Sequence, residues 1–255
     1  MAISRDAVGG LFTAAVVMLT GSLAGCGAVA DEDGERELIV LAAASLTDVY
    51  EELATEFETQ NAHTRVSFSF GSSTDLAEQV ADGAPGDVLA TADEASLQLA
   101  EDAGVTGEIS TLATNVLSIV TRPDNPGAVE TLDDLEGATW VRCTDEAPCG
   151  KVAAAVLADN DITAEPASLE EDVRATLDKV ISGEADAGLV YATDVVAAGD
   201  EVVAVEIPGA ETALTTYFTT VLEQSVEPDL AQEWVDFVTS EDGLAILEQA
   251  GFGTP

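Results

Sequence analysis

The sequence predicts an α/β protein, because short apolar runs that suit buried strands alternate with amphipathic helical patterns along the chain. Residues 38–41 form an unbroken apolar run, as in a strand buried on both faces of a sheet. Residues 46–57 then carry apolar side chains at spacings of three and four, which line one face of a helix. Residues 64–70 alternate between polar and apolar, which indicates a second strand. This order favours mostly parallel sheets flanked by helices.

The first group of elements continues with two further strand-to-helix units. A helix should begin after the small residues at 71–73 and end at Gly83, since glycine commonly ends helices. Residues 86–91 suit a short buried strand. The following helix, at residues 94–102, should end before Gly104. The first part of the chain therefore has three strands, each followed by a helix.

A second group of elements occupies the middle of the chain. Its expected strands are at 116–120, 139–143, 187–191 and 202–207, and its expected helices are at 150–160 and 169–181. A long strand at 214–222 should return to the first group, which helices at 229–238 and 244–250 complete. The repeated alternation implies parallel sheets, and such sheets bind ligands at the carboxyl ends of their strands.

The charge of the chain limits the classes of partner that it can bind. With 49 acidic and 8 basic residues, the chain has a net charge of −41. It has almost nothing with which to neutralise phosphates, which argues against nucleic-acid binding. Hydrophobic residues make up 47% of the chain, so it is not a disordered acidic polymer.

The N-terminus has the pattern of an export signal. Its apolar segment at residues 11–23 is too short to span a bilayer comfortably. The segment ends in the letters LAGCG, which resemble a bacterial lipobox and imply cleavage before Cys26 with a diacylglyceryl thioether on its sulfur. The alternative is a plain signal peptide with Cys26 as a bystander. Residues 1–26 are thus the expected signal peptide, and residues 27–37 a polar tether.

The two remaining cysteines are six residues apart. In an exported protein, this spacing of Cys143 and Cys149 suggests a disulfide that closes a small loop. A metal-binding pair is the alternative. Zinc sites take about four ligands, however, and the single histidine, His63, is far away in sequence.

Three strand-to-helix turns carry small or hydroxyl residues at the expected start of a helix. They contain Ser45, the pair Ser72–Ser73, and the segment 148–150. Free N–H groups and partial positive charge at a helix N-terminus attract anions. Ser45 stands where an N-cap is expected, with Asp48 close to completing a capping box. Each serine could be a simple helix cap, but three such turns in a chain poor in cations favour an anion site.

Six short motifs occur along the chain: AAASL at 42–46, SST at 72–74, GAPGDV at 83–88, EDVR at 171–174, GLVY at 188–191 and AGF at 250–252. Together these motifs resemble those of the periplasmic molybdate-binding proteins of molybdate ABC transporters. Their order and spacing match over residues 38–254. The resemblance implies a two-lobed clamshell of the type II periplasmic binding fold, with a mostly parallel sheet flanked by helices in each lobe. Lobe 1 would comprise residues 38–115 and 218–255, and lobe 2 residues 116–217.

The resemblance also implies which residues hold the oxyanion. Ser45, Ser73 and Tyr191 match positions that donate side-chain hydroxyls, whereas Val173 and Cys149 match positions that donate backbone N–H groups. Cys149 departs from the family pattern, which has a small residue there, and a disulfide at that point puts the choice between molybdate and tungstate in doubt. A pocket of neutral donors suits an oxyanion that carries no proton, and it avoids burying an unpaired cation. No cofactor besides the molybdate or tungstate ligand is expected.

The implied partners are a membrane permease of the ABC class and the membrane itself, through the lipid on Cys26, for a protein expected to be monomeric. Enzymatic activity is not expected, because a serine hydrolase needs a base and no Gly-x-Ser-x-Gly motif occurs. Alternatives are a receptor for another small anion, such as sulfate, phosphate or an organic anion, and a surface-tethered sensor or adhesion module.

Overall fold

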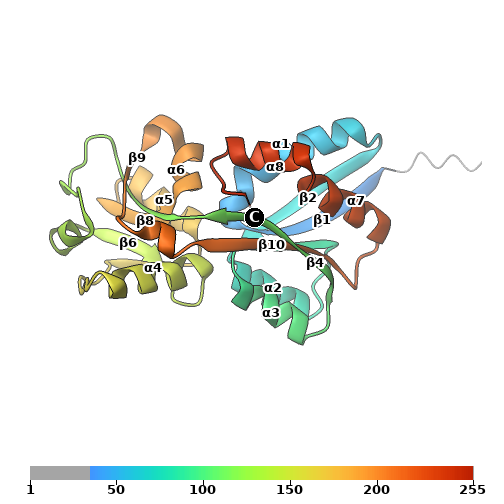
Figure 1. Ribbon diagram of the computed structural model, residues 1–255, viewed down its shortest axis with the longest axis horizontal. Helices are drawn as coiled ribbons and strands as arrows, with labels where there is room; N and C mark the ends of the chain where they lie inside the picture. Colours follow the sequence, from blue (N-terminus) through green and yellow to red (C-terminus); the bar gives the residue numbers. More distant parts are fainter. Residues whose placement is uncertain (1–34, 255) are drawn as a thin grey trace, which may run out of the picture. The chain divides into compact units, whose positions relative to one another are not determined.

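The computed structural model describes residues 35–254 of the chain (Figure 1). The expected signal peptide at 1–26 and the expected lipid attachment site at Cys26 lie outside the described residues. Strand β1 (Arg36–Ala43) begins inside the expected tether, since Arg36 already pairs with the neighbouring strand. Within the described part of the chain, no helix is both long and apolar enough to cross a membrane.

The structure contains two five-stranded sheets (Figure 1). The first has the order β2-β1-β3-β10-β4, where β2 is Thr64–Gly71, β3 is Val88–Thr91, β10 is Thr215–Leu222 and β4 is Thr106–Asn115. The second has the order β7-β6-β8-β5-β9, where β7 is Ser168–Glu170, β6 is Trp140–Cys143, β8 is Ala187–Tyr191, β5 is Leu117–Thr121 and β9 is Val203–Val205. We call each sheet with its helices a lobe, lobe 1 containing β1 and lobe 2 containing β8.

Four of the five strands in each sheet run in the same direction and one runs against them, which confirms the expected mostly parallel sheets and adds one antiparallel strand to each. In lobe 1, β1 pairs in parallel with β2 and β3, whereas β10 is antiparallel to both β3 and β4. In lobe 2, β6 pairs in parallel with β7 and β8, whereas β5 is antiparallel to β8 and β9. The antiparallel pairs arise where the chain passes between lobes, because β4 leaves lobe 1 and β10 returns to it in the opposite direction.

Helices cover both faces of each sheet, as expected for an α/β protein. In lobe 1, α1 (Thr47–Gln60), α7 (Pro228–Val238) and α8 (Glu241–Gln249) cover one face, and α2 (Ser73–Ala81) and α3 (Glu94–Asp102) cover the other (Figure 1). In lobe 2, α4 (Pro148–Asp159) lies on one side and α5 (Val173–Ile181) and α6 (Ala192–Ala198) on the other. Trp234 of α7 meets the rings of Tyr50 and Phe57 edge to face in the lobe 1 core.

Two local predictions were wrong for identifiable reasons. Strand β4 was not predicted, because most of its residues are small or polar and only half-buried. The sequence therefore has no apolar run at this strand. Residues 169–181 were predicted as one helix, but β7 ends at Glu170 and the helix begins at Val173. Asp172 separates the two elements, since its carboxylate accepts the backbone N–H groups of Arg174 and Ala175 and so caps α5.

Candidate functional site

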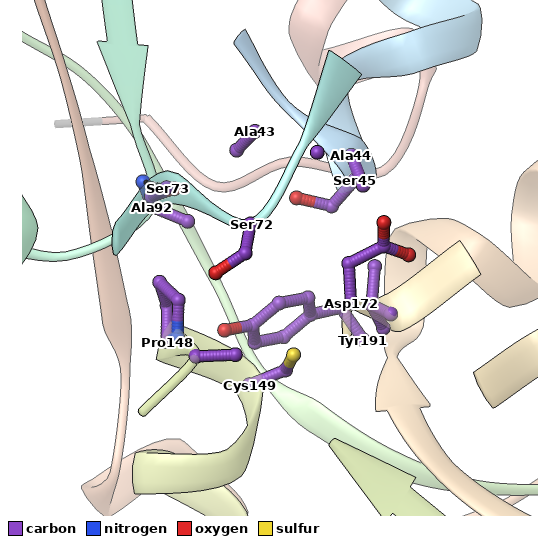
Figure 2. Close-up of a pocket in the computed structure, with 13 residues that line it drawn as sticks. Ala43, Ala44, Ser45, Ser72, Ser73, Ala92, Pro148, Cys149, Asp172 and Tyr191 are labelled. Atoms are coloured by element: carbon purple, nitrogen blue, oxygen red, sulfur yellow. Dashed lines mark hydrogen bonds between the residues drawn. The ribbon is translucent and has the colours of Figure 1, made fainter. Parts of the chain in front are cut away.

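A small cavity lies where the strand-to-helix turns of the two lobes meet, and all five predicted ligand-binding residues line it (Figure 2). Its lining residues are Ala43, Ala44, Ser45, Gly71, Ser72, Ser73, Ala92, Ala147, Pro148, Cys149, Asp172, Val173 and Tyr191. The cavity volume is about 10 Å³. This is far below the roughly 300–1,000 Å³ of sites for drug-sized molecules, so the cavity has room only for a small ligand.

Ser73 is the first residue of α2, and its hydroxyl is held in one role. The backbone N–H of Ala92 donates to Ser73 Oγ at 2.9 Å. Because that oxygen already accepts a hydrogen bond, its own hydrogen is available to another acceptor in the cavity. Ser72, which precedes it, is the N-cap residue by backbone conformation and uses no side-chain cap bond. Ser72 also lines the cavity and was not among the predicted ligand residues.

Ser45 lines the cavity, but it is not the helix cap that the sequence suggested. Residues Ala44–Leu46 form a 3₁₀ turn, and α1 begins after Leu46 without a side-chain cap. The hydroxyl of Ser45 instead lies 2.8 Å from the hydroxyl of Tyr217 on β10. The contact joins residues 172 positions apart in sequence, so no local pattern could have indicated it.

Cys149 is held at the N-terminus of α4 by a disulfide to Cys143, which confirms the predicted bridge. No group of three or more metal-ligating side chains occurs among residues 35–254, so the metal-pair alternative has no support there. The next residue must be glycine, because a Cβ on Gly150 would lie 1.7 Å from the carbonyl oxygen of Thr144. Pro148 occupies the first helical position, so Cys149 and Gly150 lie in the first turn and their N–H groups have no acceptor within their own helix.

Val173 places its backbone, and not its side chain, at the cavity. Its side chain belongs to the lobe 2 core and is buried. As the first residue of α5, it has an N–H group without an intrahelical acceptor. Asp172 beside it lines the cavity as well, with its carboxylate turned to the first N–H groups of the helix.

Tyr191 ends β8 and presents a buried hydroxyl without a hydrogen-bond partner among the described residues. Burial is the main cause that raises the pKa of Tyr191 well above its usual value, so the hydroxyl stays neutral and keeps its hydrogen. Figure 2 shows the Tyr191 hydroxyl beside Pro148 and Cys149, with Ser45 and Ser72 on the other side of the cavity. A buried donor without a partner is costly, so this hydroxyl is well suited to an anionic ligand.

Arg174 connects the two lobes beside this cavity. Its guanidinium forms an ion pair with Asp48 of α1 and donates from Nε to the Ala44 carbonyl oxygen at 3.3 Å, both in lobe 1. Within lobe 2, Nε lies 3.5 Å from Oδ1 of the fully buried Asp194, close enough for an ion pair but without hydrogen-bond geometry. The other carboxylate oxygen of Asp194 accepts the Tyr191 N–H at 2.9 Å. Arg174 thus links parts of the cavity wall from both lobes.

A second inter-lobe contact involves Lys151 of α4. Its ammonium group lies 2.8 Å from Oδ2 of Asp93, which caps α3 in lobe 1. Nearby, the hydroxyl of Thr74 donates to the carbonyl oxygen of Glu146 at 2.7 Å. Neither Lys151 nor Arg174 lines the cavity, so the positive charges sit beside the candidate site and the donors inside it are neutral.

Burial of Asp194 should make the stability of the protein depend on pH. Desolvation, only partly offset by Arg174, raises the pKa of Asp194 from 3.8 to about 7. The native state therefore binds more protons than the unfolded state between these values, and stability falls as pH rises through this window. The loss is on the order of 4 kcal/mol. Urea melts of wild type and of Asp194→Asn at several values from about pH 4 to about pH 8 give the free energy of unfolding of each protein. We expect this free energy to fall with rising pH in wild type and to lack that fall in Asp194→Asn.

The control is Asp124→Asn, which removes an exposed carboxylate that pairs with Arg122. It should keep the wild-type dependence on pH. An identical dependence in wild type and Asp194→Asn would contradict the assignment to Asp194.

Comparisons with known proteins place the chain in a family. A family profile described as bacterial extracellular solute-binding protein matches residues 38–253. The chain belongs to this family. The molybdate-binding protein ModA of Mycobacterium tuberculosis H37Rv is 35% identical over 257 residues, covering 96% of this chain and 98% of that protein. The resemblance to molybdate-binding proteins that the motifs indicated is thereby confirmed, and this family member is an extracytoplasmic binding protein and not an enzyme.

Solved structures extend the agreement to the two-lobed fold. The periplasmic molybdate-binding protein of Azotobacter vinelandii matches with a TM-score of 0.74 at 24% identity, covering 86% of this chain and 99% of that one. The sulfate-binding protein SubI of Mycobacterium tuberculosis also matches with a TM-score of 0.74, at 20% identity, covering 85% of this chain and 86% of that one. At these identities the likeness establishes the fold alone, so the two matches do not discriminate between the oxyanions.

Proposed function

We propose that this family member captures molybdate between its lobes and delivers it to an ABC importer in the membrane. The observation that carries the proposal is the set of neutral donors around one small cavity: the hydroxyls of Ser45, Ser73 and Tyr191 and the N–H groups of Cys149 and Val173. Molybdate is a dianion without a proton at neutral pH, so it needs donors only. The 35% identity to the mycobacterial molybdate-binding protein supports the same ligand.

Tungstate is the second proposed ligand. It has the same charge and tetrahedral shape as molybdate, so the same five donors would serve both. The disulfide between Cys143 and Cys149 holds one donor in place, so the cavity can change its size less to fit a larger or smaller ion. Sulfate is smaller, so its oxygens would not reach all the donors together. Hydrogen phosphate would place a proton against a donor.

Calorimetric titration of the mature domain with molybdate, tungstate, sulfate and phosphate tests the proposal. We expect the first two to bind at least about 100-fold more tightly than the last two, because each unmet hydrogen bond to a charged ligand costs about 1.5–3 kcal/mol. Equal affinity for sulfate or phosphate would reject molybdate as the selected ligand. An organic-anion receptor would become the first choice if none of the four oxyanions bound.

The proposal includes attachment of a monomeric protein to the outer face of the membrane through a lipid on Cys26. It is supported by the lipobox-like sequence at residues 23–27. Metabolic labelling with a fatty-acid analogue should mark the wild-type protein and fail to mark Cys26→Ala. Equal labelling of the two proteins would exclude this anchor.

A further inference from the structure

A line of buried hydrogen bonds leads from the strands that connect the lobes to the candidate site. Asn115 ends β4 and Tyr217 lies on β10, so both belong to the segments through which the chain crosses between lobes. The side-chain amide of Asn115 donates to the Tyr217 hydroxyl at 3.3 Å, and that hydroxyl lies 2.8 Å from Ser45 Oγ. All three side chains are buried, and only Ser45 lines the cavity.

The orientation of the Asn115 amide follows from its neighbours. The backbone N–H of Val116, which can only donate, points to Asn115 Oδ1 at 2.9 Å. The nitrogen Nδ2 must then be the atom that faces Thr193 Oγ1 at 2.8 Å and the Tyr217 hydroxyl. Since an amide NH₂ group carries two hydrogens and accepts none, Asn115 donates to both hydroxyls.

The donor role of Asn115 bears on the direction of the next hydrogen bond. The Tyr217 oxygen accepts from Asn115, so its own hydrogen is free to point at Ser45 Oγ. Ser45 Oγ is the remaining hydrogen-bond partner of the buried Tyr217 hydroxyl among the described residues, so we assign Tyr217 as the donor to Ser45. The hydrogen of Ser45 is then left for an acceptor in the cavity. Burial raises the pKa of Tyr217 above its usual value, which keeps this hydrogen on the tyrosine. Every hydrogen bond in the line thus runs toward the cavity.

We infer that Asn115 and Tyr217 are positioning residues that force the Ser45 hydroxyl to donate into the cavity and thereby set its preference for oxyanions without a proton. This inference rests on the proposed oxyanion function and adds two residues to it. Ser73 is held in the same donor role by the Ala92 backbone N–H, which cannot reverse. The hydrogen bonds that end at Ser45 can be reversed by substitution, because their first donor is the side chain of Asn115.

Asn115→Asp should reverse the direction of the hydrogen bonds between residue 115 and Ser45. The carboxylate can still accept the Val116 N–H, but its second oxygen can only accept, so Tyr217 and Thr193 must donate to it. Three donors around the carboxylate favour its ionised form. The Tyr217 hydrogen is then used on residue 115, Ser45 must donate to Tyr217, and Ser45 presents a lone pair to the cavity. A lone pair there suits an oxyanion that carries a proton.

The measurement is the ratio of sulfate to phosphate dissociation constants at about pH 8, where both ions are mainly dianions and phosphate keeps one proton. We expect Asn115→Asp to raise this ratio by at least about tenfold, because phosphate gains one hydrogen bond in the variant and sulfate loses one. Both ligands have the same charge, so repulsion by the new carboxylate cancels in the ratio.

The matched control is Asn115→Asp combined with Tyr217→Phe. It keeps the new charge but removes the hydroxyl through which the line reaches Ser45, so the ratio should return to within about threefold of wild type. Equal shifts in the single and double variants, or no shift in either, would overturn the inference. Molybdate binding by wild type tests the proposed function separately, since the line can fail while molybdate still binds.

Should Asn115→Asp not fold, a double-mutant cycle with Ser45→Ala and Tyr217→Phe gives the same decision. If Tyr217 orients Ser45, the loss of molybdate affinity on Ser45→Ala should be at least about threefold smaller in the Tyr217→Phe background. Additive losses would overturn the inference.

Discussion

Replacing Ser45 and Ser73 together by alanine is expected to weaken molybdate binding by about 100- to 10,000-fold. Each hydroxyl has one hydrogen-bond partner outside the cavity, Tyr217 for Ser45 and the Ala92 N–H for Ser73. A hydrogen bond to a charged ligand is worth about 1.5–3 kcal/mol, and two such losses give this range if they add. Calorimetry on the two single variants and the double variant measures the effect.

The single variants should differ in stability, because the two serines have different partners. Ser73→Ala leaves the buried N–H of Ala92 without its acceptor and should lower the free energy of unfolding by about 1–3 kcal/mol. Ser45→Ala removes a contact between side chains and should cost less. Ser118→Ala is the control, since Ser118 is a buried serine of lobe 2 that does not line the cavity. A double variant that still binds molybdate within about threefold of the control would contradict the proposed role of both hydroxyls.

The second large effect is expected from the cations that join the lobes. Replacing Lys151 and Arg174 together by methionine should speed molybdate release by about 10- to 100-fold, because the closed arrangement loses its ion pairs to Asp93 and Asp48. Arg174 also loses its bond to the Ala44 carbonyl oxygen, next to Ser45. Partly exposed ion pairs are worth about 1 kcal/mol or less each, so Arg174 should account for the larger share. Stopped-flow tryptophan fluorescence measures the release rate.

The chain contains a closely matched control for this pair. Lys179→Met with Arg122→Met removes the same charges from ion pairs that lie within lobe 2, with Glu170 and Asp124. The side chain of Lys179 is 32% exposed against 36% for Lys151, and that of Arg122 25% against 24% for Arg174. A general effect of a more negative protein would appear in both pairs, whereas an effect of lobe closure appears only in the first. Similar release rates in the two double variants would therefore show that Lys151 and Arg174 do not hold the lobes together around the ligand.

Part of the site was predictable from local sequence because its donors belong to helix starts. Ser73 and Cys149 lie in the first turn of a helix that follows a strand, and the strand and helix patterns on either side of them are visible along the chain. Val173 also lies in a first turn, but the helix expected at 169–181 placed it in the interior, so only the family resemblance indicated its role. The disulfide was predictable from spacing, since six residues suffice to bring Cys149 back to Cys143. In each of these cases the relevant atoms are near neighbours in sequence.

The sequence by itself determined the α/β class, most strand and helix positions and the helix starts at Ser73 and Cys149, because these depend on periodicity and turn chemistry over a few residues. Only the tertiary structure decided the mixed sheets, since pairing direction depends on how the chain crosses between lobes. It also decided that Ser45 bonds Tyr217 instead of capping a helix. Asn115 and Tyr217 reach the site because antiparallel pairing of β4 and β10 brings together residues 102 positions apart.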